Sequence, residues 1–276
     1  MIVGIVGLGL IGGSLAKAYC EDGHKIYGYD RDEAILGFAQ LSGAVAGVLN
    51  DQSLEECEAL FIAINPGDAL AYMEKTAPHI SKNTIVIDCC GVKRKICEKC
   101  FKLAEKYGFT FIGGHPMAGS HNAGFKNSRA NLFKGAAMIL IPPVYDNPTL
   151  FGRIEEVLKS AGFGNLTITT SQKHDEMIAF SSQMAHIVSN AYVKSPTARG
   201  HKGFSAGSYK DLTRVARLNP DMWAELCMDN NDNLIKELDG FIESLNQYRE
   251  ALSKEDHGKL RELLEEGSLI KHDLDH

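Results

Sequence analysis

The chain has 276 residues, 44% of them hydrophobic and 23% charged, with a formal net charge of -6 at pH 7. This length suits two domains or one large one, and the composition is that of an ordinary globular protein. The negative charge argues against nucleic acid or an anionic membrane as a main partner. Seven cysteines without a leader segment indicate a reducing compartment, so we expect free thiols in a cytoplasmic protein.

The N-terminal stretch follows the order strand, tight turn, helix. A β-branched run, Ile2–Val6, ends in Gly7-x-Gly9-x-x-Gly12, and apolar residues at helical spacing follow. In a dinucleotide-binding unit the first glycine allows the turn, the second admits the pyrophosphate and the third lets the helix pack on the strand. The helix N-terminus then offers its free N–H groups to the phosphates. A signal peptide or membrane anchor is excluded because no basic residue precedes this run, and the run is short and glycine-rich.

An acidic residue at the end of the second strand completes this fingerprint. Asp30 lies eighteen residues after Gly12 and closes the short run 25–30. Its carboxylate is expected to bind the ribose 2′-hydroxyl and to repel a 2′-phosphate, which favours NAD, while Arg31 leaves some room for NADP. The expected cofactor contacts are Gly7, Gly9, Leu10, Ile11, Gly12, Asp30, Arg31 and Asn65.

Strands and helices alternate through the first 170 residues. The expected strands are 2–6, 25–30, 59–64, 83–88, 109–114, 136–141 and 165–169, with helices at 31–42, 68–76 and 150–161 and a cysteine-rich helix ending at residue 107. Runs that are apolar on both faces and joined by helices predict an α/β domain with a Rossmann-type, doubly wound, mostly parallel sheet. We assign residues 1–170 to this NAD-binding domain.

Residues 171–276 read as an all-helical substrate and dimerisation domain. Apolar spacing predicts one long helix over 172–193, a Gly/Ser-rich loop, a helix over 211–218, another from Asn219-Pro220 through residue 245, and a last charged helix opened by Ser253. About 105 residues of helices make a modest core. We therefore expect a homodimer.

Two histidines are candidates for chemistry. His115-Pro116 follows a strand at the edge where open α/β sheets bind ligands, and a histidine is the commonest acceptor for a hydroxyl proton. The alternative is an ordinary loop histidine before a proline. His186 lies in a polar patch of an apolar helix, where a hydrogen-bonded core histidine is the more common reading.

Two further pairs have both a functional and a structural reading. Asp211 and Arg214 share a helix face, either as a surface ion pair or as an arginine held to bind a substrate carboxylate. Composition does not decide between them. Cys97-x-x-Cys100 suggests zinc, but no second cysteine or histidine pair follows and the cysteines fit a buried helix face. We expect no metal.

Several segments occur in order and together resemble the prephenate and arogenate dehydrogenases of tyrosine biosynthesis, over nearly the whole chain. These are Gly7-x-Gly9-x-x-Gly12-Gly13-Ser14, His115-Pro116-Met117-Ala118-Gly119, Leu132-Phe133-x-Gly135, His174-Asp175, Ala185-His186, Asp211-Leu212-Thr213-Arg214-Val215-Ala216 and Met222-Trp223. The length leaves no room for a fused chorismate mutase or a trailing regulatory domain, so the resemblance implies the short form.

The resemblance implies a reaction: hydride passes from the ring carbinol carbon of prephenate to NAD, and the ring carboxylate leaves as carbon dioxide. His115 would take the hydroxyl proton. Arg214, oriented by Asp211, would bind a substrate carboxylate. Lys93, His186 and Trp223 would also contact substrate, with Trp223 reaching the site across the dimer interface.

Departures from the family pattern leave prephenate and arogenate both open as substrates. Gly91 stands where the family has a serine, Ala185 where it has a proline, Gln183 where a histidine is frequent and Lys210 where an arginine is usual. One rival is a β-hydroxyacid dehydrogenase or a pyrroline-carboxylate reductase type enzyme. The helix lysine of the former is not found near 165–195, and neither family has the His115 motif. The other rival is a non-catalytic NAD-binding regulator, which has no need of both His115 and Arg214.

Overall fold

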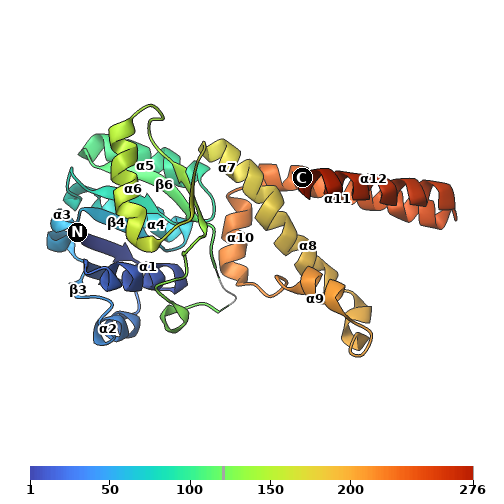
Figure 1. Cartoon of the computed structure of the whole chain (residues 1–276), viewed down its shortest axis with the longest axis horizontal. Coiled ribbons are helices and arrows are strands. Elements are labelled where there is room, and N and C mark those ends of the chain that lie inside the picture. The colour runs from blue at the N-terminus through green and yellow to red at the C-terminus, as the bar shows by residue number, and fades with distance from the viewer. Residues whose placement is uncertain (120–121, 276) are drawn as a thin grey trace.

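The computed structural model describes residues 1–119 and 122–275 and has two parts. Residues up to the end of the last strand, at Ile168, form a helix-covered sheet, and the rest forms a helical arm (Figure 1). Six of the eight strands in the described residues run in one direction, as the sequence predicts for the mostly parallel sheet of a Rossmann-type fold.

The strands form one sheet of order β3-β2-β1-β4-β5-β6-β7-β8. They are β1 (Ile2–Val6), β2 (Lys25–Tyr29), β3 (Gly47–Val48), β4 (Ala59–Ile62), β5 (Ile85–Asp88), β6 (Thr110–Pro116), β7 (Ala137–Ile141) and β8 (Asn165–Ile168). All neighbours pair in parallel except β6 and β7, where Gly114 is opposite Leu140 in antiparallel register. β7 and β8 therefore both run opposite to the other six strands. The predicted mostly parallel, doubly wound sheet is confirmed.

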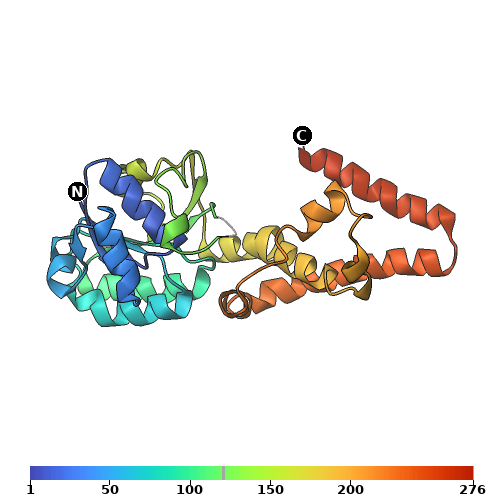
Figure 2. The ribbon, with the colours of Figure 1, turned by 90° about the horizontal axis from the view of Figure 1, so that it is seen from below.

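Helices cover both faces of this sheet (Figure 2). One buried core lies under α1 (Leu10–Glu21), α2 (Glu33–Leu41) and α6 (Pro148–Leu158). The other lies under α3 (Asp51–Glu56), α4 (Pro66–Thr76) and α5 (Arg94–Tyr107). Burial on both faces explains why the central strands are apolar throughout rather than alternating.

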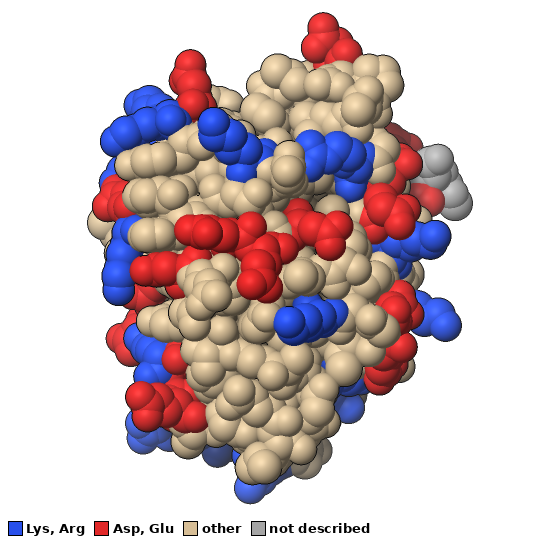
Figure 3. All heavy atoms as spheres, turned by 90° about the vertical axis from the view of Figure 1, so that its left-hand side faces the viewer, with Lys and Arg blue, Asp and Glu red and all other residues tan. Residues whose placement is uncertain are grey.

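Figure 3 looks onto the end of the sheet domain that points away from the helical arm. Acidic side chains gather in a band across the middle of this face, and Lys and Arg side chains lie around them. This face is therefore mixed in charge, in keeping with the net charge of -6.

The helical arm differs in detail from the sequence prediction. Its helices are α7 (Ser171–Ile178), α8 (Ala185–Tyr192), α9 (Gly207–Thr213), α10 (Pro220–Met228), α11 (Asn231–Ser253) and α12 (His257–Asp275). The predicted helix over 172–193 contains a π-helical turn, Ala179–Met184, between α7 and α8. The prediction of one helix from Pro220 through residue 245 is wrong, because the chain breaks between α10 and α11 at the buried Asn230.

α11 and α12 form a hairpin whose tip projects away from the sheet domain in both ribbon views (Figures 1 and 2). Large apolar side chains are exposed on this hairpin: Ile235, Phe241, Ile242, Leu245, Leu252, Leu264, Leu269, Ile270 and Leu274. Among the helices that the structure describes, none is both long and apolar enough to cross a bilayer. The hairpin thus presents an unpartnered apolar surface on an otherwise charged pair of helices.

Candidate active site

The glycine turn after β1 has the geometry that a dinucleotide requires. Gly7 has a φ of +86°, which favours glycine, and a Cβ atom on Gly12 would lie 1.8 Å from the carbonyl oxygen of Gly7. A Cβ atom on Gly9 would meet nothing within 4 Å, so the backbone there is open to a ligand. Gly9 is also the N-cap of α1 and supplies no side-chain cap. The turn and the helix N-terminus together fit the pyrophosphate of NAD.

A cavity of about 850 Å³ opens beside this turn, and its lining includes Gly7, Gly9, Asp30, Arg31 and Asn65. Asp30 accepts hydrogen bonds from the backbone amides of Leu8 (2.7 Å) and Asp32 (3.0 Å), which fix its carboxylate at the cavity wall. Arg31 is exposed, and its Nη1 atom lies 3.7 Å from Oδ2 of Asp68.

The structure thus brings together five of the eight residues predicted to hold the cofactor. Leu10 and Ile11 are half-buried in the first turn of α1, and Gly12 is buried against the turn itself. Asn65 reaches the cavity from the N-cap of α4, where β4 has ended. These roles remain predictions.

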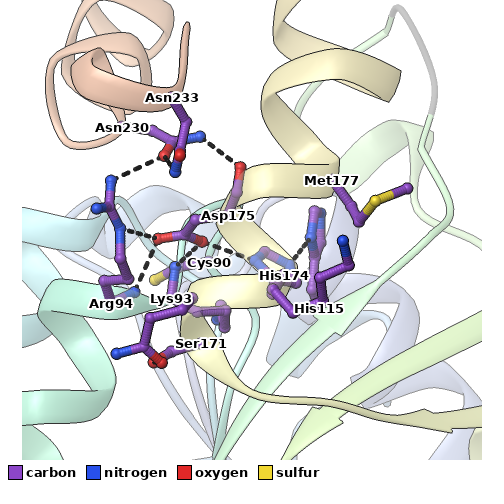
Figure 4. A network of polar contacts seen from close by, with 12 residues as sticks. Cys90, Lys93, Arg94, His115, Ser171, His174, Asp175, Met177, Asn230 and Asn233 are labelled. Atoms are coloured by element: carbon purple, nitrogen blue, oxygen red, sulfur yellow. Dashed lines mark hydrogen bonds and ion pairs between the residues drawn. The ribbon is translucent and has the colours of Figure 1, made fainter. Parts of the chain in front are cut away.

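His115 lies near the end of β6, and its ring meets a second histidine. Its Nδ1 atom is 2.9 Å from Nε2 of His174, which belongs to α7, and the ring centroids are 5.1 Å apart (Figure 4). β1, β4, β5 and β6 are parallel, so their carboxyl ends share one sheet edge. His115 and the glycine turn therefore lie on the same edge of the sheet.

Behind the two histidines lies a buried carboxylate. Nδ1 of His174 is 2.7 Å from Oδ1 of Asp175, and both of these side chains are fully buried. Asp175 also accepts from the backbone amides of Lys93 (2.7 Å) and Arg94 (2.9 Å), at the start of α5. A carboxylate at a helix N-terminus is stabilised by these free N–H groups and by the helix dipole.

Lys93 holds the end of β6 in place through buried polar contacts. Its side chain is fully buried, and its ammonium group donates to Asp88 and to the carbonyl oxygen of Gly114, the latter at 2.5 Å. Asp88 in turn accepts from the amide of Gly114 at 3.0 Å. The structure therefore places Lys93 against the strand that carries His115, whereas the family resemblance implies a substrate contact.

The electrostatics of this cluster follow from burial. Burial, together with His174 and Lys93, lowers the pKa of His115 well below its ordinary value. Burial also lowers the pKa of His174 and outweighs the opposing hydrogen bond to Asp175. For Asp175, burial alone would raise the pKa, but the hydrogen bonds from His174, Arg94 and Lys93 prevail and lower it. At neutral pH the two rings are neutral and Asp175 is ionised.

His186 and Trp223 meet within the helical arm. Their rings stack with centroids 3.9 Å apart and planes at 30°, and Nδ1 of His186 lies 2.9 Å from the carbonyl oxygen of Ser182. This contact joins α8 to α10 within one chain. His186 and Trp223, both predicted to contact substrate, are therefore neighbours within one subunit.

Arg214 and Asp211 line a different cavity, of about 560 Å³, between α8, α9 and α11. The amide of Arg214 and the carbonyl oxygen of Asp211 are 3.5 Å apart, but no ion pair joins the two side chains in the described chain. The orienting role predicted for Asp211 thus has no side-chain contact here. His115 is not part of the lining of this cavity.

Two of the departures from the family pattern lie against α10. A Cβ atom on Gly91 would lie 3.3 Å from the side chain of Leu226, so the missing serine position is covered by that leucine. Gln183 donates to the carbonyl oxygen of Leu226 and accepts from Asn230, which buries it in the junction. The thiol of Cys90 contacts the carbonyl oxygen of Ile64 at 3.6 Å.

His174-Asp175 is one of the motifs that carry the family resemblance, but the sequence alone assigned it no role, and Arg94 is not among the predicted site residues. An adjacent His-Asp pair at the start of a helix was the signal for this part of the site. Its partners are 59 and 81 residues away along the chain, and no local pattern reveals them. Within residues 1–119 and 122–275, no group of three or more His, Cys, Asp or Glu side chains is arranged to hold a metal ion.

Comparisons with known proteins agree with this architecture. A model of the nucleotide-binding domain of prephenate dehydrogenase matches residues 15–164, and a model of the dimerization domain of the same enzyme matches residues 170–266. Prephenate dehydrogenase of Bacillus subtilis is 28% identical over 267 residues, which are 91% of this chain and 70% of the relative. Cyclohexadienyl dehydrogenase of Zymomonas mobilis is 27% identical over 276 residues, or 96% and 92% of the two chains.

Solved structures give the same result. Synechocystis arogenate dehydrogenase is 28% identical, with a TM-score of 0.81 over 99% of this chain and 100% of the other. Prephenate dehydrogenase from A. aeolicus, in complex with hydroxyphenyl propionate and NAD+, is also 28% identical, with a TM-score of 0.83 over 99% and 98% of the two chains. Because the first family model alone spans more than half of the sequence, the chain belongs to the prephenate dehydrogenase family.

Proposed function

We propose that this chain catalyses the NAD-dependent oxidative decarboxylation of prephenate to 4-hydroxyphenylpyruvate. The observation that carries the proposal is the neutral, half-buried His115 at the sheet edge that also carries the glycine turn. A general base for hydroxyl oxidation must be uncharged at working pH and close to the hydride acceptor. The relatives named prephenate dehydrogenase support this choice of substrate.

Each part of the site has a separate role in this reaction. His115 accepts the proton of the ring hydroxyl as the carbinol carbon is oxidised. The nicotinamide ring of NAD, when bound, would accept the hydride. The glycine turn and α1 hold the pyrophosphate, and Asp30 holds the ribose. The Asp88–Lys93 pair, joined to both backbone polar groups of Gly114, keeps the end of β6 in place beneath His115.

Arogenate is the second candidate substrate. The Synechocystis relative is named arogenate dehydrogenase, at the same identity as the prephenate enzyme from A. aeolicus. The test is a side-by-side assay of prephenate and arogenate, each with NAD and with NADP, followed by NADH or NADPH absorbance. We expect turnover of prephenate with NAD, and its loss in His115→Asn with NAD affinity nearly unchanged. Normal turnover in that variant would refute the role of His115.

We further propose that the protein is a cytoplasmic homodimer. The chain matches a dimerization-domain model, and apolar side chains are exposed on α11 and α12. Both observations support a second subunit that covers these side chains. All seven cysteines are free thiols, which fits a reducing compartment. Light scattering is expected to give twice the mass of 30.2 kDa, and Ile242→Glu is expected to give the single mass. A wild-type protein that stays monomeric at micromolar concentration would contradict the dimer.

A further inference from the structure

We propose that His174 is a positioning residue that fixes which nitrogen of His115 carries hydrogen, so that Nε2 of His115 is the atom that takes the substrate's hydroxyl proton. The geometry of His115, His174 and Asp175 carries this inference. Its catalytic half rests on the proposed dehydrogenase function, while its structural half concerns the protonation of two rings and stands without it.

The chain of hydrogen bonds has one consistent assignment. An ionised carboxylate only accepts, so Oδ1 of Asp175 requires a hydrogen on Nδ1 of His174, 2.7 Å away. A neutral imidazole with hydrogen on Nδ1 has a lone pair on Nε2. That lone pair faces Nδ1 of His115 at 2.9 Å, which must then donate. His115 is left with its own lone pair on Nε2, the nitrogen of a general base.

Asp175 can impose this order because it is held on several sides. Besides the amides of Lys93 and Arg94, it accepts from Nε of Arg94 at 3.3 Å. Its backbone carbonyl accepts from the side chain of Asn230 at 2.8 Å. Figure 4 shows these contacts converging on Asp175 from α5 and from the junction of α10 and α11, with His174 and His115 in line on the other side.

The same arrangement stabilises the reaction's charged state. When Nε2 of His115 gains the substrate's proton, the ring becomes a cation that burial disfavours. Nε2 of His174 then accepts a charge-assisted hydrogen bond, and the anion of Asp175 lies directly behind it. No proton needs to leave His115 for His174 during the step. The proton is released to water after the product departs.

The charged groups that act on the two rings come from β5, the start of α5 and α7. Lys93 at the start of α5 and Asp88 at the end of β5 form a buried pair, and Asp175 follows His174 on α7. Lys93 and Asp88 offset each other, and Arg94 is shared between Asp175 and Asp232, so one net negative charge remains on this side of the rings. Asp175 is the nearest anion to His174, and its charge is the one that the imidazolium of His115 would meet through that ring.

Two substitutions at His174 separate positioning from simple packing. The side-chain amide of His174→Asn reaches where Nδ1 stood, so it keeps the donor to Asp175 and loses the contact with His115. The amide of His174→Gln reaches where Nε2 stood, so its oxygen keeps an acceptor for Nδ1 of His115. We expect kcat to fall about 10²-fold in His174→Asn and less than tenfold in His174→Gln, with the KM for NAD unchanged in both.

The matched control is Lys173→Gln, the preceding residue on α7, whose side chain is 57% exposed and pairs with Glu176. It should leave kcat unchanged. An equal loss of kcat in both His174 variants, or a larger loss in His174→Gln, overturns the positioning role. Such a result would mean that the contact with Asp175, which only supports the fold, is the one that matters.

A spectroscopic measurement keeps the inference testable without turnover. In protein labelled with ¹⁵N-histidine, long-range ¹H–¹⁵N spectra at pH 7.5 distinguish the two neutral ring forms, and the His115 signals are assigned from His115→Asn. We expect hydrogen on Nδ1 of His115 in the wild type and in His174→Gln. Hydrogen on Nε2 in the wild type overturns the inference. Absence of turnover with prephenate would refute the proposed function alone.

Discussion

Arg94 forms a two-pronged ion pair with Asp232, with Nη1 to Oδ2 at 2.7 Å and Nη2 to Oδ1 at 2.5 Å. The same guanidinium donates to Asn230 at 2.9 Å and, through Nε, to the buried Asp175. Arg94 therefore connects the first residue of α5 in the sheet domain with the start of α11 in the helical arm. Hydrogen bonding to Arg94 holds the pKa of Asp232 well below its ordinary value.

Asp232→Asn should loosen this junction. The pair is partly exposed, with 30% of the arginine and 60% of the aspartate side chain open to solvent, so we expect a loss of about 1 kcal/mol in the free energy of unfolding. Urea unfolding at low and at 0.5 M salt measures it, and the difference from wild type should shrink with salt. The control is Glu98→Gln, which breaks an exposed pair within α5. Equal midpoints for Asp232→Asn and wild type would show that the pair adds nothing.

Arg214→Ala tests whether the cavity between α8, α9 and α11 serves the substrate. A charge-assisted contact with a carboxylate contributes about 1.5–3 kcal/mol, so the KM for prephenate should rise about 10- to 100-fold. The KM for NAD should stay the same. Arg217→Ala, three residues further on and also exposed, is the matched control. If both variants keep the wild-type KM, Arg214 is a surface residue.

Asp30→Asn should change the choice of cofactor. Asparagine keeps an oxygen for the amide of Leu8 but removes the charge that repels a 2′-phosphate. We expect the ratio of kcat/KM for NAD over NADP to fall at least about tenfold, equal to about 1.4 kcal/mol. Steady-state assays with both cofactors measure the ratio. Asp32→Asn, which keeps the N-cap of α2, should leave it unchanged. An unaltered ratio in Asp30→Asn would remove Asp30 from cofactor selection.

The free energy of unfolding should depend on pH through the histidine pair. Folding lowers the pKa of His115 and of His174, so below about pH 6.5 the unfolded chain binds protons that the folded chain excludes. The free energy of unfolding therefore does not depend on these two rings above that pH. As the pH falls further, it decreases by at most about 1.4 kcal/mol per pH unit for each ring. Urea unfolding between pH 8 and pH 5 gives the slope. His115→Asn should reduce it, and parallel slopes would contradict the assignment.

The cofactor half of the site could be predicted from the sequence because its determinants are local. Gly7, Gly9 and Gly12 lie within one turn. Backbone sterics require glycine at Gly7 and Gly12, and Gly9 leaves the backbone open to a ligand. Asp30 follows from the spacing of one βαβ unit. The apolar runs predict the sheet for a similar reason, since strands buried on both faces leave little room for polar residues.

The direction of β7 could not be read from its residues. A run buried on both faces looks the same whether it pairs in parallel or antiparallel with its neighbour. Between β6 and β7 the described residues form a single short 3-10 helix, Phe125–Asn127, and no α-helix of the kind that usually connects a parallel pair. The lack of a helical pattern between the two strands was the available clue.

By itself, the sequence determined the glycine turn, the acidic residue that follows the second strand, the sheet class and the position of His115 at a strand end, because each depends on residues near one another in the chain. Only the tertiary structure decided that His115 meets His174, that Asp175 is held by the first turn of α5, and that the chain turns at Asn230 to reach them. These contacts join residues 55 to 82 positions apart. Such contacts form only when separate elements pack together, and no local propensity encodes them.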